Sequence, residues 1–163
     1  MQPLELLDSA DLLLRPQGEE TTEANLRRAW SSIYYALFHV ISQDCADRII
    51  GDSDECRAQR AWHQVYRALD HGPGKVRCKT IAKENAHLNF PDGIRDVAAL
   101  FVTLQNKRHE ADYDMRSTPT STDVRGYIAE VREVVERFLA CDDKHKKAFA
   151  AYLLVHHRDK NNG

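Results

Sequence analysis

Long hydrophobic runs, strand-like alternation and internal repeats are all missing from this chain of 163 residues. A membrane-spanning helix requires roughly 18 consecutive apolar residues. No run in the sequence approaches that length, so we expect no contact with a membrane. Alternation of apolar and polar residues with a period of two would indicate half-buried strands. Because no segment shows it, we expect a protein without β-sheet.

Cysteine and histidine do not form metal-ligand spacings. The four cysteines lie far apart in the sequence without any C-x-x-C pair, and the eight histidines are scattered. Zinc sites normally show closely spaced pairs of such residues, so we predict free thiols, no metal and no other cofactor. The first residues, MQPLELLDSADLLLR, carry acidic side chains where a signal peptide would carry basic ones. We therefore expect a protein of the reducing cytoplasm.

Neither sign of charge dominates the composition. A formal net charge of −2 argues against a protein that coats nucleic acid over its whole surface, although a local basic patch stays open. Hydrophobic residues make up 42% and charged residues 29% of the chain, which is typical of a folded globular protein. At this length we expect one domain, residues 1–163.

Glycine, proline and capping residues divide the chain into helical segments, which predict an all-α, up-and-down bundle of five to six helices. We expect a short helix built on Leu4, Leu7, Leu12 and Leu14 and closed by Pro16 and Gly18, then a long helix capped by Thr21 or Thr22 that ends near Ile50. Later helices are expected at 54–71, capped by Asp52 or Ser53 and stopped by Gly72-Pro73-Gly74, at 90–110 with Asp92 near the cap, at 123–141 and at 143–158. Residues 75–90 are ambiguous between a short helix and a loop.

The long second helix has two unusual faces. At about 100° per residue, one narrow stripe carries the residues expected in the core: Leu26, Trp30, Ile33 and Leu37. The opposite side, where Lys and Glu would normally face water, carries Arg28, Ser32, Tyr35 and His39, with Phe38 beside them. An aromatic, an imidazole and an arginine together indicate burial against another helix, a second subunit or a ligand.

The stretch KRHEADYDM, residues 107–115, crowds both signs of charge, an imidazole and a phenol directly after the apolar run VAALFVTL. Lys107 and Arg108 would complement the dipole at a helix end, and Asp112 or Asp114 would suit an ion pair with an arginine such as Arg28. Alternatively, Arg108 holds a phosphate while His109 or Tyr113 carries a proton. Asp112, Asp114 and His109 could also bind a metal ion, but the sequence places no further ligand group to complete such a site.

Two segments resemble a known family. LRRAWSSIYYALFHVIS, residues 26–42, is similar to the long helix of HEPN domains, the higher eukaryote and prokaryote nucleotide-binding superfamily, where a pattern close to RRAxxxAYYAxFH recurs. KRHEADYD, residues 107–114, resembles the later motif of one HEPN branch, which is close to LRxxADYD. The two motifs occur in the family's order, and the resemblance covers about residues 20–141.

The resemblance implies a helical up-and-down bundle, often a homodimer, of the kind found in bacterial and archaeal toxin–antitoxin, phage-defence and CRISPR-associated systems. Many members are metal-independent endoribonucleases, whose signature is an arginine, a polar residue and a histidine a few positions further on. On this chain the arginine corresponds to Arg108 and the polar residue to His109. The histidine position holds Asp112 or Tyr113 instead, and a phenol is a poor general base at neutral pH.

Three hypotheses follow, and all require the two motifs to meet across one cleft. The first is a HEPN-like module without the usual catalytic histidine, which binds a nucleotide, RNA or a partner protein, such as a nucleotidyltransferase from the same operon, through Arg28, Tyr35, His39 and Asp112. The second is an endoribonuclease toxin in which Arg108 acts with His109, Tyr113 or His39. The third is a purely structural dimerisation module.

Overall fold

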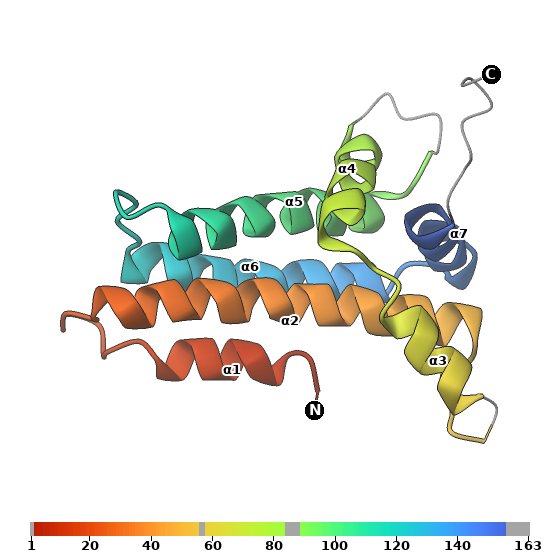
Figure 1. Cartoon of the computed structure of the whole chain (residues 1–163), viewed down its shortest axis with the longest axis horizontal. Helices are drawn as coiled ribbons and strands as arrows, with labels where there is room; N and C mark the ends of the chain where they lie inside the picture. Colours follow the sequence, from red (N-terminus) through yellow and green to blue (C-terminus); the bar gives the residue numbers. More distant parts are fainter. Residues whose placement is uncertain (1, 56–57, 84–88, 156–163) are drawn as a thin grey trace.

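The computed structural model describes residues 2–55, 58–83 and 89–155, and these residues form seven α-helices and no strand (Figure 1). The all-α prediction is therefore confirmed. The expected count of five to six is lower than the seven helices of the described ranges, because the region between residues 54 and 90 contains two short helices. No helix of these ranges is long and apolar enough to cross a membrane.

Helix α2 (Glu23–Ile49) is the centre of the bundle (Figure 1). It contacts α1 (Glu5–Leu12), α3 (Gln59–Tyr66), α5 (Asp92–Tyr113), α6 (Ser121–Leu139) and α7 (Asp143–Leu154). It begins where predicted, because the Thr22 hydroxyl accepts a hydrogen bond from the Asn25 N–H at 3.4 Å and so satisfies one orphan donor of the first turn. It ends before Gly51, whose φ of +134° is a backbone conformation that favours glycine.

The prediction of one helix over 54–71 was wrong, and neither Asp52 nor Ser53 caps it. Helix α3 (Gln59–Tyr66) is shorter, and a second helix, α4 (His71–Ala82), begins where Gly72-Pro73-Gly74 was expected to stop the chain. Pro73 lies in the first turn of α4, where a backbone N–H would have no partner within the helix, so its missing donor costs little. Residues 56–57 and 84–88 lie outside the described ranges.

The last three helices agree closely with the sequence prediction. They are α5 (Asp92–Tyr113), α6 (Ser121–Leu139) and α7 (Asp143–Leu154). Helix α5 continues three residues beyond its expected end, so Asp112 and Tyr113 belong to its last turn. The Thr120 hydroxyl accepts from the Asp123 N–H at 3.1 Å and starts α6 two residues early. The expected end of α7 at residue 158 lies outside the described residues.

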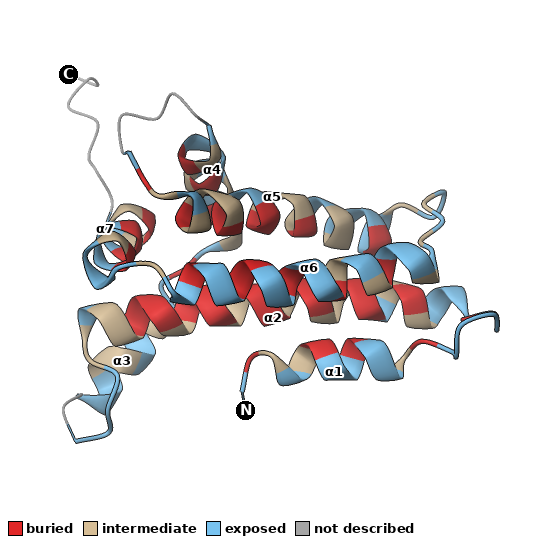
Figure 2. Ribbon diagram, turned by 180° about the vertical axis from the view of Figure 1, so that it is seen from behind, coloured by how far each residue is buried: buried red, intermediate tan, exposed pale blue. Residues whose placement is uncertain are grey.

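The core is formed where α2, α5 and α6 face one another, and their inward faces are buried in Figure 2. The predicted stripe of α2 is confirmed, because Leu26, Trp30, Ile33 and Leu37 are each at most 6% exposed. The helix expected at 123–141 has an apolar stripe at helical spacing. On α6 its members Val124, Ile128, Val131, Val134, Val135 and Phe138 are buried, whereas Tyr127 on the same stripe is only partly buried. Each such side chain contributes about 1.5–3 kcal/mol by leaving water. The cysteines of the described ranges, Cys45, Cys78 and Cys141, are free thiols.

Glycine allows the start of α5 to approach the end of α6. A Cβ at Gly93 would lie 2.7 Å from the Cys141 Sγ and 2.9 Å from the Arg137 carbonyl oxygen. The second of these contacts is with main-chain atoms, which cannot rotate away as a flexible side chain would. The close packing of these two helix ends therefore depends on the missing side chain.

We predict that Gly93→Ala lowers the free energy of unfolding by about 1–3 kcal/mol, because the added methyl group overpacks this contact. Gly126→Ala is the matched control, since nothing lies within 4 Å of its Cβ position in the middle of α6. That variant should instead gain about 0.5–1 kcal/mol of helix propensity. Urea denaturation of both variants gives the comparison, and an unchanged Gly93→Ala would contradict the close approach.

Two charged side chains are buried near α7. Lys146 is 8% exposed, and its Nζ donates to the Leu139 carbonyl oxygen at 2.9 Å, at the C-terminus of α6. Asp44 is 5% exposed, and its Oδ2 has no hydrogen-bond partner. Burial raises the pKa of Asp44 from 3.8 to about 6, although the nearby cations Arg48 and Lys146 oppose this rise.

The raised pKa of Asp44 predicts a pH-dependent cost of folding. The folded state holds this proton more tightly than the unfolded chain does, so the associated stability is present below about pH 4 and is lost as the pH rises to about 6. Above that pH the loss amounts to about 3 kcal/mol. Asp44→Asn should therefore be more stable than the parent at pH 8 by about 2–3 kcal/mol and nearly equal to it at pH 4. Thermal or urea unfolding at the two pH values tests this, and equal differences at both would contradict the assignment.

Candidate ligand-binding cleft

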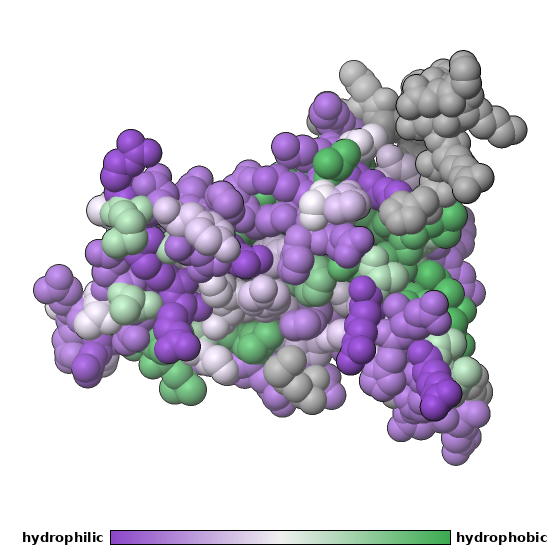
Figure 3. Space-filling model, viewed as in Figure 1, coloured by the Kyte–Doolittle hydropathy of each residue, from purple (hydrophilic) through white to green (hydrophobic). Residues whose placement is uncertain are grey.

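A cleft of about 680 Å³ lies along α2, between α1 and the end of α5. Its lining includes all four residues predicted from the sequence to bind a ligand, namely Arg28, Tyr35, His39 and Asp112, together with Ser31 and Ser32. The two sequence motifs therefore meet at one cleft within a single chain. The face of the molecule seen in Figure 3 is largely hydrophilic, with small hydrophobic areas.

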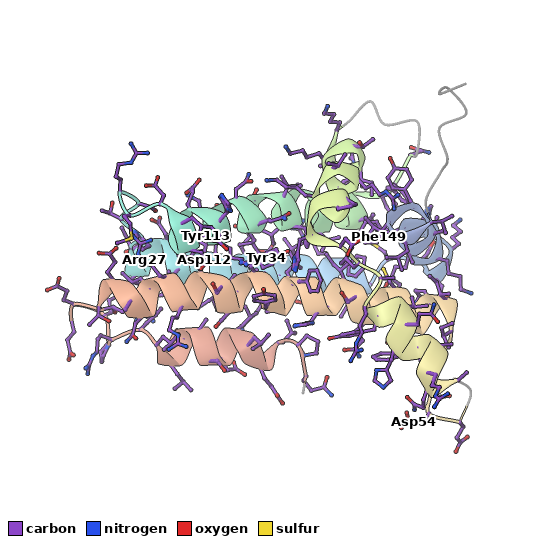
Figure 4. All side chains as sticks on the ribbon, viewed as in Figure 1. Arg27, Tyr34, Asp54, Asp112, Tyr113 and Phe149 are labelled. Atoms are coloured by element: carbon purple, nitrogen blue, oxygen red, sulfur yellow. The ribbon has the colours of Figure 1, made fainter. Side chains whose placement is uncertain are left out.

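Asp112 connects α5 to α2 at the edge of this cleft. Its Oδ2 accepts from the Arg108 Nε at 3.0 Å, one helical turn away on α5, and its Oδ1 accepts from the Ser31 hydroxyl at 3.1 Å (Figure 4). The guanidinium carbon of Arg108 lies 5.2 Å from the ring centroid of Tyr35 and 5.3 Å from that of Tyr34. Arg108 is thus held by a carboxylate and by the negative faces of two aromatic rings.

Arg27, not Arg28, fixes the segment that follows α5. Its Nη1 donates to the carbonyl oxygens of Ala111 at 2.6 Å and Asp114 at 3.2 Å, and its Nη2 donates to that of Ser117 at 2.9 Å. The expected ion pair between Arg28 and an acid of the motif is not formed. Asp112 pairs with Arg108 and Asp114 with Arg116. Arg28 has no hydrogen bond or ion pair with any described residue, and its side chain lines the cleft.

His71 belongs to the surroundings of Arg108 and was missed in the sequence. Its Nδ1 is hydrogen-bonded to the hydroxyl of the buried Tyr34, and its backbone oxygen accepts from the Gln105 Nε2 at 2.9 Å. Its ring stacks on Phe38 with centroids 4.6 Å apart. The Gly-Pro-Gly segment after it obscured the start of α4, so no helical periodicity marked His71.

His39 is held in a similar way on the other side of Phe38. Its Nδ1 is 2.8 Å from the hydroxyl of Tyr66, and the two rings lie 9° from parallel at 5.9 Å. Burial lowers the pKa of His39, and nearby His71 lowers it further. Burial also lowers the pKa of His71, as does the charge of Arg108. These shifts favour the neutral form of both imidazoles. Neither Nε2 has a hydrogen-bond partner among the described residues.

His109 and Tyr113 lie on the outer side of α5. Their ring centroids are 4.8 Å apart, and Tyr113, labelled in Figure 4, is 69% exposed. Neither residue lines the cleft. Of the three residues considered for catalysis in the sequence, only Arg108 reaches the aromatic side chains of α2. Within the described ranges, no group of three or more His, Cys, Asp or Glu side chains is placed to hold a metal ion.

Comparison of the chain with protein-family models, with curated proteins and with solved structures finds no match. The chemistry of the cleft therefore has to be inferred from its own residues. They supply the guanidinium of Arg28, which has no hydrogen bond or ion pair with a described residue, that of Arg27, which is bound to main-chain carbonyls, and the carboxylate of Asp112. The rings of Tyr35 and His39 complete this set.

We predict that Tyr34→Phe lowers the free energy of unfolding by about 1–2 kcal/mol, because it removes the hydroxyl that binds His71 in a buried setting. Tyr113→Phe removes the same atom from an exposed side chain and should change stability by less than about 0.5 kcal/mol. Chemical denaturation of both variants measures the difference. Equal effects would contradict the placement of these two tyrosines.

Proposed function

We propose that the chain is a HEPN-like module of a bacterial or archaeal toxin–antitoxin or defence-type system, and that it binds single-stranded RNA through the cleft along α2. The single observation that carries the proposal is the unpaired guanidinium of Arg28 at the wall of a cleft lined by Tyr35 and His39. A free arginine suits a phosphate, and aromatic rings suit stacked bases. The resemblance of residues 26–42 and 107–114 to HEPN motifs supports the same class.

The three arginines near the cleft differ in their partners, and this indicates which of them is available to bind a phosphate. Arg27 is occupied by three backbone carbonyls, and Arg108 by Asp112 and two rings. Of these three, only Arg28 has no partner in the described chain. A phosphate could therefore pair with its full positive charge without breaking an existing contact. Arg108 then serves to position Tyr34 and Tyr35.

A short fluorescent single-stranded RNA tests this proposal. Arg28→Ala should weaken its binding by about five- to ten-fold and reduce the dependence of the affinity on salt by about one phosphate contact. Arg137→Ala is the matched control, because Arg137 pairs with Asp96 away from the cleft, and it should bind RNA as the parent does. Fluorescence anisotropy at several salt concentrations measures both. If the parent does not bind RNA, or if the two variants behave alike, the proposal fails.

A metal-independent endoribonuclease is the second candidate, favoured by two imidazoles: that of His71, whose pKa is lowered by burial and by the charge of Arg108, and that of His39, which stacks on Tyr35. His39 or His71 would accept the proton of the 2′-hydroxyl, and Arg108 would stabilise the charge that develops on phosphorus. The RNA of the binding assay, run on a denaturing gel with and without a chelator, separates the candidates. Cleavage that resists the chelator and is lost in His71→Ala would favour the enzyme, whereas intact RNA would leave the binding module.

Two further parts of the proposal come from the resemblance alone. They are a homodimer and a partner protein from the same operon, such as a nucleotidyltransferase. A purely structural dimerisation module is the remaining alternative, and it requires RNA binding to be absent from the parent and from every variant. The same anisotropy series therefore addresses it.

A further inference from the structure

A second cavity, of about 430 Å³, lies between the N-terminal segment, the C-terminal half of α2, the end of α6 and the start of α7. It shares no lining residue with the cleft described above. Its lining includes apolar residues, among them Leu4, Val40 and Val135, and charged residues, among them Asp44, Arg48 and Lys146. Its volume is within the range of pockets that hold small organic molecules.

Two polar atoms at this cavity have no hydrogen-bond partner within residues 2–55, 58–83 and 89–155. They are the Oδ2 of Asp44, on a side chain that is 5% exposed, and the Nε of Arg48. The Arg48 Nε lies 3.6 Å from the Asp44 Oδ1, which is an ion-pair distance but too long for a hydrogen bond. Buried polar groups in folded proteins are nearly always satisfied. An acceptor and a donor left open one helical turn apart are therefore unusual.

The neighbouring charges are already occupied and balanced. Lys146 donates to the Leu139 carbonyl, Asp47 accepts from the Trp62 Nε1 at 2.8 Å, and Arg48 reaches Asp143 through its Nη1. Two carboxylates, of Asp44 and Asp47, and two cations, of Arg48 and Lys146, line the cavity itself. A ligand with a net charge would therefore leave one charge uncompensated in a poorly solvated place, so a neutral ligand fits best.

A neutral group that satisfies both open atoms must present an N–H next to a C=O. We propose that this cavity binds a small planar molecule through a lactam edge, of the kind carried by uracil, hypoxanthine and guanine. The lactam N–H donates to the Asp44 Oδ2, and the adjacent carbonyl oxygen accepts from the Arg48 Nε. The flat face of the ring packs against Val40 and Val135. This site does not depend on the function proposed for the cleft.

Both side chains must rotate to reach such a ligand, because the Asp44 Oδ2 and the Arg48 Nε each have less than 1 Å² of exposed surface. The terminal torsion of an aspartate is broad, so the carboxylate turns easily. The Arg48 side chain is 19% exposed and lines the cavity, so it has room to turn as well. The raised pKa of Asp44 agrees with this role, because burial destabilises the ionised carboxylate, which is therefore stabilised most when a hydrogen-bond donor reaches it.

Calorimetric titration of the full chain with uridine, inosine and guanosine at pH 7.5 tests the site. At least one of the three should bind saturably, and the N-methylated lactam of that nucleoside, for example 3-methyluridine for uridine, should bind at least ten-fold more weakly because it lacks the N–H. Asp44→Asn should also weaken binding at least ten-fold. Asp96→Asn, which changes an exposed acid paired with Arg137, is the matched control and should bind as the parent does.

Three outcomes would overturn the proposal. The first is that none of the three nucleosides binds saturably to protein whose thermal unfolding shows it to be folded, which would leave the cavity to water only. The second is equal binding of the methylated and unmethylated nucleosides. The third is unchanged binding in a folded Asp44→Asn. Because the ligand series does not rely on any variant, the test stands even if Asp44→Asn fails to fold.

Discussion

The carboxylate of Asp112 is the link on which the arrangement of the cleft depends. It receives the Arg108 guanidinium from its own helix and the Ser31 hydroxyl from α2, so it ties the end of α5 to the first half of the central helix. With α5 fixed in this way, Arg108 stands over Tyr34 and Tyr35. Tyr34 in turn holds His71 at the start of α4. One acid thus orders side chains from three helices.

The sequence predicts those parts of the fold that are set by periodicity and by local caps. The core stripe of α2 can be recognised because apolar residues repeat at the period of a helical turn. The start at Thr22 can be recognised because its capping hydrogen bond spans only three residues. Helix α4 was missed for the opposite reason. Its Gly-Pro-Gly start has the composition of a turn, yet the Gly74 N–H donates to the Asp70 carbonyl oxygen at 2.9 Å as the helix begins.

The sequence predicted most of the functional side chains that line the cleft, but not which charged side chains would pair with one another. Arg27 and Arg28 are neighbours about 100° apart on the helix, and no local pattern tells which of them will meet the loop after α5. The motif KRHEADYD likewise gives the identity of its side chains but not their directions. Arg108 and Asp112 point towards α2, whereas His109 and Tyr113 lie on the outer side. The buried pair of Asp44 and Lys146 left no sequence signal, because charged residues one helical turn from apolar ones are also typical of an exposed face.

Arg27 recognises the segment after α5 through carbonyl oxygens alone, and every residue type supplies that atom. This contact therefore does not depend on which side chains follow α5. Met115, Arg116 and Thr118 all project from this anchored loop as exposed residues. Substitutions at these exposed positions would therefore change the surface of the loop while the carbonyl contacts keep the path of its backbone.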